Sequence, residues 1–310
     1  MNEFSLIKKY FAPLAAGFAG GLGLTDDAAV FSPPSGHELV ITKDAICEGV
    51  HFIGNEPPEM IAAKALRVNL SDLAAMGATP ICYFLALSMP KDTSEEWVAK
   101  FAVGLQKTQS EFAISLAGGD TTATLGALTI SITAIGSLPT GSALRRNGAQ
   151  VGDDIFVSGT LGDAALGLKI LAADNRQLTT NNHLINRYLT PIPRLALGQS
   201  LRGIASSCMD ISDGLLQDLG HICAASHVGA VIYSEKLPIS EAARNTGGAL
   251  ESAISGGDDY ELLFSVPPEK AHLVPKGCTK IGEIIAGETV KLLNENGEDI
   301  TPINKGFSHF

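Results

Sequence analysis

The chain lacks the features of secreted and membrane-spanning proteins. Its five cysteines are scattered, with no C-x-x-C pair, so neither a disulfide framework nor a zinc knuckle is predicted. No run of about 18 consecutive apolar residues occurs, and no long apolar stretch follows the first charges of the N-terminus. We therefore expect a protein of the reducing cytoplasm that neither enters nor crosses a membrane.

Basic residues are also in deficit. The chain has 22 Lys and Arg against 33 Asp and Glu, a formal net charge of −11 at pH 7. Such a balance is unsuited to a nucleic-acid or anionic membrane surface. If this chain binds phosphates, metal ions must help.

The standard nucleotide-binding signatures are missing as well. There is no G-x-x-x-x-G-K-[ST] loop, no G-x-G-x-x-G turn after a strand, and no protein-kinase catalytic loop. Any ATP site must therefore be built in another way.

What is present indicates two α/β units. With 310 residues and 45% apolar composition, the chain can bury a sizeable core. Apolar and β-branched patterns predict strands at 39–46, 81–89 and 128–135. Helical spacing predicts a helix at 59–76 with Asn69 and Asp72 near its end, and Thr93 and Glu96 have the spacing of a capping box that begins another.

A second unit is expected after residue 145. Its first segment, 155–172, reads as strand, glycine turn and helix. The remaining predicted elements are helices at 193–206 and 213–226 and strands at 261–266 and 280–285. The predicted class is α/β or α+β with mixed sheets, in two domains, 1–145 and 146–310.

The aspartates carry the strongest functional signal, because many of them lie among small or apolar residues rather than in solvated charge runs. The segments are LTDDAAV (24–30), ITKDAI (41–46), NLSDLAAMGA (69–78), AGGDTT (117–122) and MDISDGL (209–215). Carboxylates in such surroundings should reach solvent or meet cations, because burying them unpaired is costly. Hard oxygen ligands suit Mg²⁺.

Each segment also has a plainer interpretation. Asp120 follows two glycines and could belong to a turn. Ser212 or Asp213 could simply cap a helix, although the N-terminal N–H groups of that same helix would also favour an anion.

Taken together and in this order, these segments resemble the thiamine-monophosphate kinase family, in the superfamily that includes aminoimidazole ribonucleotide synthetase. The resemblance runs from EFSLIKKYF (3–11) through RRNGA, VSGTLGDAALGL and SGGDDYEL to KGFSHF at the C-terminus. It implies that superfamily's two-domain fold, with an N-terminal ATP- and Mg²⁺-binding domain that forms a homodimer and a second domain that completes the active site. The implied activity is ATP-dependent phosphorylation of thiamine monophosphate to thiamine diphosphate.

The resemblance also implies site residues. In that family several Mg²⁺ ions are bound by the positions that match Asp27, Thr42, Asp44, Asp72, Asp120, Asp210 and Asp213 of this chain. Others contact ATP (Gly119, Asp120, Arg146 and Ser212) or thiamine (His51, Asp258 and Phe307). Considered without the family, Arg145 could replace Arg146, His51 could be an ordinary loop residue, and Phe307 could be a packed aromatic.

The chemistry of the substrates agrees with such a metal site. ATP and a phosphate monoester repel each other, and Mg²⁺ held by carboxylates offsets that repulsion. A monoester is largely dianionic at pH 7, with a second pKa of about 6, so its oxygen needs no strong general base. The expected mechanism is direct in-line transfer without a catalytic base or a phosphoenzyme.

Three positions depart from the family pattern: Thr25 replaces a usual Gly, Lys43 a usual Thr, and Asp258 a frequent Glu. A cation beside Asp44 could replace a metal contact or touch a phosphate, and the shorter Asp258 could reach thiamine through water. Two other functions stay open at this point. They are aminoimidazole ribonucleotide synthetase and a catalytically silent metal- or nucleotide-binding protein.

Overall fold

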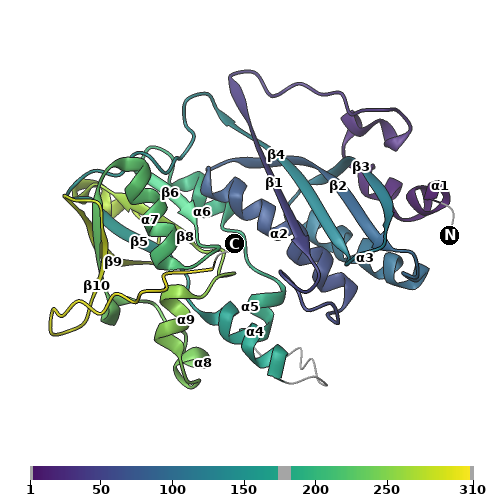
Figure 1. Ribbon diagram of the computed structural model, residues 1–310. Coiled ribbons are helices and arrows are strands. Elements are labelled where there is room, and N and C mark those ends of the chain that lie inside the picture. The colour runs from purple at the N-terminus through teal and green to yellow at the C-terminus, as the bar shows by residue number, and fades with distance from the viewer. Residues whose placement is uncertain (1–2, 174–182, 308–310) are drawn as a thin grey trace. The chain divides into compact units, whose positions relative to one another are not determined.

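The computed structural model describes residues 3–173 and 183–307 (Figure 1). By its internal contacts the chain forms two units, Met1–Leu73 with Ala78–Gly141, and Ala74–Gly77 with Ser142–Phe310. The main division thus follows Gly141, whereas the sequence predicts a boundary near residue 145. Each unit has its own sheet.

The first unit is built on a four-stranded mixed sheet. Short helical turns occupy its N-terminal part: α1 (Glu3–Leu6), η1 (Ile7–Phe11), η2 (Ala12–Ala15) and η3 (Ala19–Leu24). Its strands are β1 (His37–Cys47), β2 (Thr79–Pro90), β3 (Ser115–Thr124) and β4 (Thr129–Pro139), and its long helices are α2 (Pro58–Ala75) and α3 (Glu95–Glu111). The order is β1-β4-β2-β3, antiparallel except for the parallel pair β2 and β3.

Both long helices pack on one face of this sheet (Figure 1). From that face the Thr42 hydroxyl of β1 bonds to Asp72 of α2, and the Tyr83 hydroxyl of β2 donates to Gln109 of α3 at 3.1 Å. In β4 the residues Ile130 and Ile132 are buried while Ser131 between them is half-buried. The strand predicted at 128–135 is therefore confirmed, and its two faces differ in burial.

The second unit contains a six-stranded mixed sheet of order β10-β7-β9-β5-β8-β6. The strands are β5 (Asp154–Ser158), β6 (Ser207–Asp210), β7 (Gly229–Tyr233), β8 (Leu262–Val266), β9 (Cys278–Ile285) and β10 (Val290–Leu293). The helices are α4 (Asp163–Ala173), α5 (His183–Leu189), α6 (Leu195–Ser200), α7 (Leu215–Ser226), α8 (Glu241–Arg244) and α9 (Ala249–Ser255), with 3-10 turns η4 (Ser234–Lys236) and η5 (Pro268–Leu273).

Both faces of this second sheet are apolar, which is why its strands read as nearly continuous apolar runs. Ile155 and Val157 of β5 pack with the buried face of α7, including Leu215 and Leu219. Phe156, between them, points to the other face, where it stacks on Phe264 at a centroid distance of 5.7 Å. The two clusters form the core that supports the loops at the strand ends.

Two predicted helix boundaries are wrong. Helix α3 is capped by Ser94 and not Thr93, because the extended backbone of Ser94 lets its hydroxyl accept from the Trp97 N–H at 3.1 Å. The helix expected at 193–206 is only the short α6, since Gly203 has a φ of 75° and the chain turns before β6.

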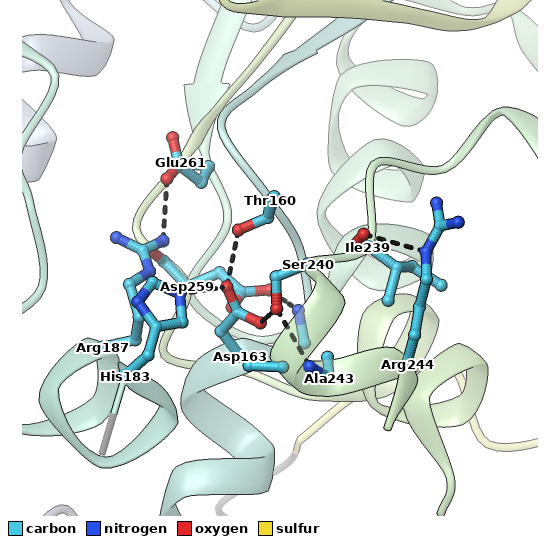
Figure 2. Close-up of polar contacts among 12 residues, drawn as sticks. Thr160, Asp163, His183, Arg187, Ile239, Ser240, Ala243, Arg244, Asp259 and Glu261 are labelled. Carbon is cyan, nitrogen blue, oxygen red and sulfur yellow. Dashed lines mark hydrogen bonds and ion pairs between the residues drawn. The ribbon is translucent and has the colours of Figure 1, made fainter. Parts of the chain in front are cut away.

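One carboxylate ties several elements of the second unit together. Glu261 is fully buried and accepts from Arg187 at 2.7 Å, from the Nε of Arg194 at 2.7 Å, and from the Ser158 hydroxyl. Figure 2 shows Arg187 directed at this carboxylate. The negative charge of Glu261 is thus matched by two guanidinium groups, which makes its burial tolerable.

The neighbouring residues fix the loop that precedes β8. Buried Asp259 accepts the Gly162 N–H at 2.8 Å, and its carbonyl accepts from Arg187 at 3.2 Å. Burial raises the pKa of the Asp259 carboxyl well above its usual value, and Arg187 partly opposes that rise. On either side, Asp258 and Tyr260 have left-handed backbones, with φ of 67° and 52°. This strained conformation persists because the loop is anchored from both sides.

A second buried carboxylate lies beside this loop. Asp163, at the start of α4, accepts from the hydroxyls of Thr160 at 2.5 Å and Ser240 at 2.6 Å, and contacts His183 at 3.3 Å (Figure 2). Ser240 also caps α8, because its hydroxyl accepts the Ala243 N–H. Asp163 therefore links the first turn of α4 to α5 and α8.

No helix within 3–173 and 183–307 has the length and apolar character needed to cross a membrane.

The Glu261 network predicts a large effect on stability. Glu261→Gln would leave two guanidinium groups without a carboxylate, and removing one partner of a buried ion pair costs about 3–5 kcal/mol. We expect a matching fall in the free energy of unfolding measured with urea. Lys100→Gln, which removes an exposed pair with Glu96, should leave it nearly unchanged. An equally small effect of Glu261→Gln would contradict the role assigned to the network.

Helix packing predicts opposite effects on stability for two glycine-to-alanine substitutions, one at a helix contact and one at an open helix surface. A Cβ at Gly167 of α4 would lie 2.1 Å from the Leu184 carbonyl of α5, whereas one at Gly220 of α7 would meet no heavy atom within 4 Å. Gly167→Ala should therefore lower the unfolding free energy by about 1–3 kcal/mol. Gly220→Ala should raise it by about 0.5–1 kcal/mol. Urea unfolding of both variants tests this, and a change of the same sign in both would count against the packing.

Candidate active site

The first unit contains a cleft of about 340 Å³ that is lined by three carboxylates. Asp26 and Asp27 reach it from the segment after η3, and Asp120 reaches it from β3. Among the described residues that line this cleft, none is basic. We call it the acidic cleft. An anionic ligand would be repelled from it unless cations came with that ligand.

The backbone on one wall of the acidic cleft is strained. Leu22, Gly23 and Leu24 are consecutive left-handed residues, with φ of 50°, 65° and 60°. Two of the three are not glycine, and such strain is typical of functional segments. Thr25 itself has a right-handed φ of −106°, and its hydroxyl donates to the Leu22 carbonyl at 2.8 Å. The position where the family usually has Gly thus needs no glycine here.

Strand β3 also lines the acidic cleft, so the interpretation of AGGDTT as a turn is wrong. Gly119 is required there, because a Cβ would lie 2.0 Å from the Leu85 carbonyl of β2. This close approach lets the strand continue to Asp120, whose Oδ1 accepts the Thr121 N–H at 2.9 Å. Gly119 and Asp120 both line the acidic cleft.

Thr42, Asp44 and Asp72 form a second polar group, where β1 meets α2. Thr42 and Asp44 alternate with exposed residues of β1 and are therefore on its helix-covered face. The Thr42 hydroxyl donates to Asp72, and the Asp44 N–H donates to the Asn69 side chain at 3.1 Å. Asn69 and Asp72 lie one turn apart on α2, which explains why they reach the same strand.

Lys43 points to the other face of the sheet. Its ammonium donates to the Ser131 hydroxyl at 2.6 Å. Asp120 lies on this same face by register, since it pairs with Ala86 and Ala86 pairs with Ser131. Lys43 is therefore not beside the Asp44 carboxylate, and the sheet separates the Asp44 side chain from that of Asp120.

His51 lies in the turn after β1, and its orientation is defined. Its Nδ1 accepts the Cys47 N–H at 3.1 Å, and its carbonyl accepts from buried Lys64 at 3.0 Å. Because Nδ1 is an acceptor, neutral His51 carries its proton on Nε2.

In the second unit, the loop after β6 is organised by a residue that the sequence analysis missed. Asp218 Oδ2 accepts the backbone N–H groups of Ser212, Asp213 and Gly214, each at 3.1 Å. Three successive amides of this kind form an anion-binding concavity, and here the protein's own carboxylate fills it. These three amides precede α7 and are taken by Asp218, so the expectation that the N–H groups of the helix itself favour a ligand anion stays a prediction. Capping by Ser212 or Asp213 is wrong, because the N-cap of α7 is Gly214 without a side-chain bond.

The surroundings of Asp218 perturb its titration. Burial raises the pKa of its carboxyl to about 7, the nearby Asp213 carboxylate adds to the rise, and the amides of Asp213 and Gly214 oppose it. Asp213, Asp218 and His221 each place a possible ligand atom within 4.8 Å of the others. Asp210, at the end of β6, is buried with 4% exposure.

The remaining predicted residues of the second unit have distinct settings. Asp258 donates its N–H to the Ser212 carbonyl at 2.8 Å and accepts from the Tyr260 hydroxyl at 3.1 Å. Its left-handed backbone favours Asp over longer side chains, which gives a reason for the departure from Glu. Phe307 is 47% exposed, not packed in the core. The side chains of Arg145 and Arg146 are both exposed, so the choice between them stays a prediction.

The sequence held a signal for two of the missed residues, Asp218 and Asp26. Asp218 occupies the apolar face of α7 between Leu215, Leu219 and Ile222, where an unpaired carboxylate is costly and hence needs a structural reason. Asp26 directly precedes a predicted ligand. For Arg187 and Glu261 no local pattern exists, because 74 positions separate the partners.

Comparison with known proteins identifies the family. The chain matches the models of the AIR synthase related protein N-terminal domain over residues 25–138 and C-terminal domain over residues 150–293. It is 42% identical to the thiamine-monophosphate kinase of Escherichia coli K12, covering 100% of this chain and 98% of the relative.

Comparison with solved structures supports the same family. The thiamine-monophosphate kinase of Stenotrophomonas maltophilia K279a matches with a TM-score of 0.83 at 42% identity, over 94% of this chain and 97% of that one. AaThiL complexed with AMPPCP and TMP matches with a TM-score of 0.81 at 33% identity, over 99% and 97% of the two chains. The predicted fold of two mixed α/β domains is confirmed. This chain belongs to the thiamine-monophosphate kinase family of enzymes, within the AIR synthase related proteins.

Proposed function

We propose that this protein transfers the γ-phosphoryl group of ATP to thiamine monophosphate and so forms thiamine diphosphate. The observation that carries the proposal is the acidic cleft, in which three carboxylates occur without a basic lining residue. Full-length similarity to kinases of this name, and to AaThiL complexed with AMPPCP and TMP, supports the choice of substrates.

The donors of the first unit fit Mg²⁺. They are carboxylate and hydroxyl oxygens, which are hard ligands of the kind that this ion prefers. Asp27 and Asp120 would hold metal at the acidic cleft, while Thr42, Asp44 and Asp72 would do so on the helix-covered face. Bound Mg²⁺ would neutralise charge on the phosphates of the two substrates.

The second unit would contribute further metal ligands, Asp210 and Asp213. Gly119, Asp120, Arg146 and Ser212 would contact ATP, and His51, Asp258 and Phe307 would contact thiamine. The half-exposed Phe307 suits stacking on an aromatic ring. These assignments follow the matched family positions.

The reaction would need no general base from the protein. The attacking oxygen belongs to a phosphate monoester that is largely dianionic at pH 7. Asp218, whose pKa is raised to about 7, has one oxygen taken by three amides, which gives it a structural task instead. In-line transfer without a phosphoenzyme follows from this chemistry.

Two further proposals concern the state of the protein. We expect a homodimer formed through the first unit, because Leu39 and Ile41 are 38% and 63% exposed on the open face of β1. We expect the enzyme to work in the cytoplasm, where ATP and reduced thiols are available.

The test is turnover with ATP, Mg²⁺ and thiamine monophosphate, following ADP and thiamine diphosphate by chromatography. Wild-type protein should form both in equal amounts. Asp120→Asn should lower kcat by about 100-fold or more, because even outer-shell changes at metal sites cost 10- to 100-fold. Asp92→Asn, an exposed aspartate in the turn after β2, should retain wild-type activity.

Three other outcomes of this assay would contradict parts of the proposal. Wild-type protein that binds Mg-ATP but forms no thiamine diphosphate would overturn the substrate assignment, and the aminoimidazole ribonucleotide synthetase reaction would be assayed next. Absence of ADP with any acceptor would identify a silent binder. Full activity of Asp120→Asn would overturn the metal assignment at the acidic cleft.

A further inference from the structure

The last described residues, 301–307, follow β10 without forming a helix or strand. Ile303 in this segment is fully exposed, and Asn304 and Lys305 are exposed as well. Thr301 anchors its beginning, since its hydroxyl accepts the Leu292 N–H at 2.8 Å. The segment needs a second anchor at its other end if Phe307 is to have a defined position.

That second anchor is the Asp213 loop. The Phe307 N–H donates to the Asp213 carbonyl at 3.0 Å. Gly306 approaches so closely that a Cβ there would lie 2.6 Å from the same carbonyl and 2.8 Å from the Gln217 Cβ. Any side chain at position 306 would therefore displace the segment from this loop.

Gln217 bridges the two partners with its side-chain amide. Its Nε2 donates to the Phe307 carbonyl at 2.8 Å and to the Asp213 carboxylate at 3.2 Å. Asp213 and Gln217 are four residues apart where α7 begins, so they lie on the same side of the helix start. A primary amide supplies two N–H groups and adds no charge beside a carboxylate.

We propose that Gln217 is a positioning residue that couples the C-terminal segment to the Asp213 loop. Its side-chain amide binds both the Asp213 carboxylate, which is expected to bind a divalent cation, and the backbone of Phe307, which is expected to contact thiamine. Binding of the cation at Asp213 then stabilises the attachment of Phe307, and loss of the amide weakens it. The roles of Asp213 and Phe307 rest on the proposed function, but the attachment itself does not.

A purely local contact is the alternative. In that case removal of the amide would alter the order of the segment without affecting its response to the cation. The two cases differ in hydrogen exchange and steady-state kinetics, so both are measured.

The first experiment compares wild-type protein with Gln217→Met, which keeps chain length and helix propensity but removes the donor. Hydrogen–deuterium exchange of a peptide covering Gly306 and Phe307 is followed with and without Mg²⁺. We expect slower exchange with Mg²⁺ in the wild type, and exchange about 10-fold faster and independent of Mg²⁺ in the variant. Gln106→Met, an exposed glutamine of α3, should behave as wild type.

Gln217→Glu serves as the second variant, since it has the same length but offers no N–H and adds a negative charge beside Asp213. It should lose the protection as Gln217→Met does, with exchange in the rest of α7 unchanged. Equal exchange of wild type and both variants would overturn the attachment. Loss of protection that leaves the response to Mg²⁺ intact would overturn the coupling.

Steady-state kinetics test whether Gln217 affects binding of thiamine monophosphate. The KM for thiamine monophosphate should rise about 10-fold in Gln217→Met, with the KM for Mg-ATP and kcat little changed. An unchanged KM for thiamine monophosphate would limit Gln217 to a structural role. If wild-type protein showed no turnover, the proposed function would fail, while the exchange results would still decide whether Gln217 holds the segment.

Discussion

Uncompensated negative charge is the constraint on which the rest of this structure depends. The chain carries a net charge of −11, and three carboxylates line a cleft without a basic lining residue. Close carboxylates repel each other unless cations or hydrogen-bond donors stand between them. For each group of acidic residues, the cations or hydrogen-bond donors that offset its negative charge explain its position.

Inside the second unit the compensation is built in. Two guanidinium groups match Glu261, hydroxyls match Asp163, and three backbone amides match Asp218. These contacts fix the loops that carry Asp213 and Asp258. In the acidic cleft of the first unit, by contrast, Asp27 and Asp120 are exposed to solvent. The proposed metal-dependent phosphoryl transfer would account for this difference, because cations bound with the substrate would complete the cleft.

Much of the fold could be predicted from sequence, since apolar periodicity identifies long elements. The β1, β2 and β4 strands and helices α2 and α7 match their predicted ranges to within a few residues. The β3 strand was not predicted, because its two glycines and Asp120 have low strand propensity, and pairing with β2 overrides that propensity. The position of a helix cap also depends on backbone angles that a capping-box spacing cannot distinguish at neighbouring residues.

The candidate site likewise contains residues that could be predicted from sequence and residues that could not. Asp27 and Asp120 could be singled out because acidic residues among small ones stand out in a sequence. Lys43 could not be placed, because its distance from Asp44 depends on strand alternation and on Ser131, 88 positions away. Gln217 could not be singled out, because no residue pattern encodes its contacts to the Phe307 carbonyl and the Asp213 carboxylate. Asp218 stands out as a carboxylate on the apolar face of α7, but its three backbone partners cannot be read from that position.

The central claim is that cations complete the acidic cleft, and calorimetric titration of the wild-type protein with ATP tests it most directly. ATP should bind in the presence of Mg²⁺ and show no measurable binding when Mg²⁺ is replaced by EDTA at the same ionic strength. Equal affinity for ATP under both conditions would contradict the account.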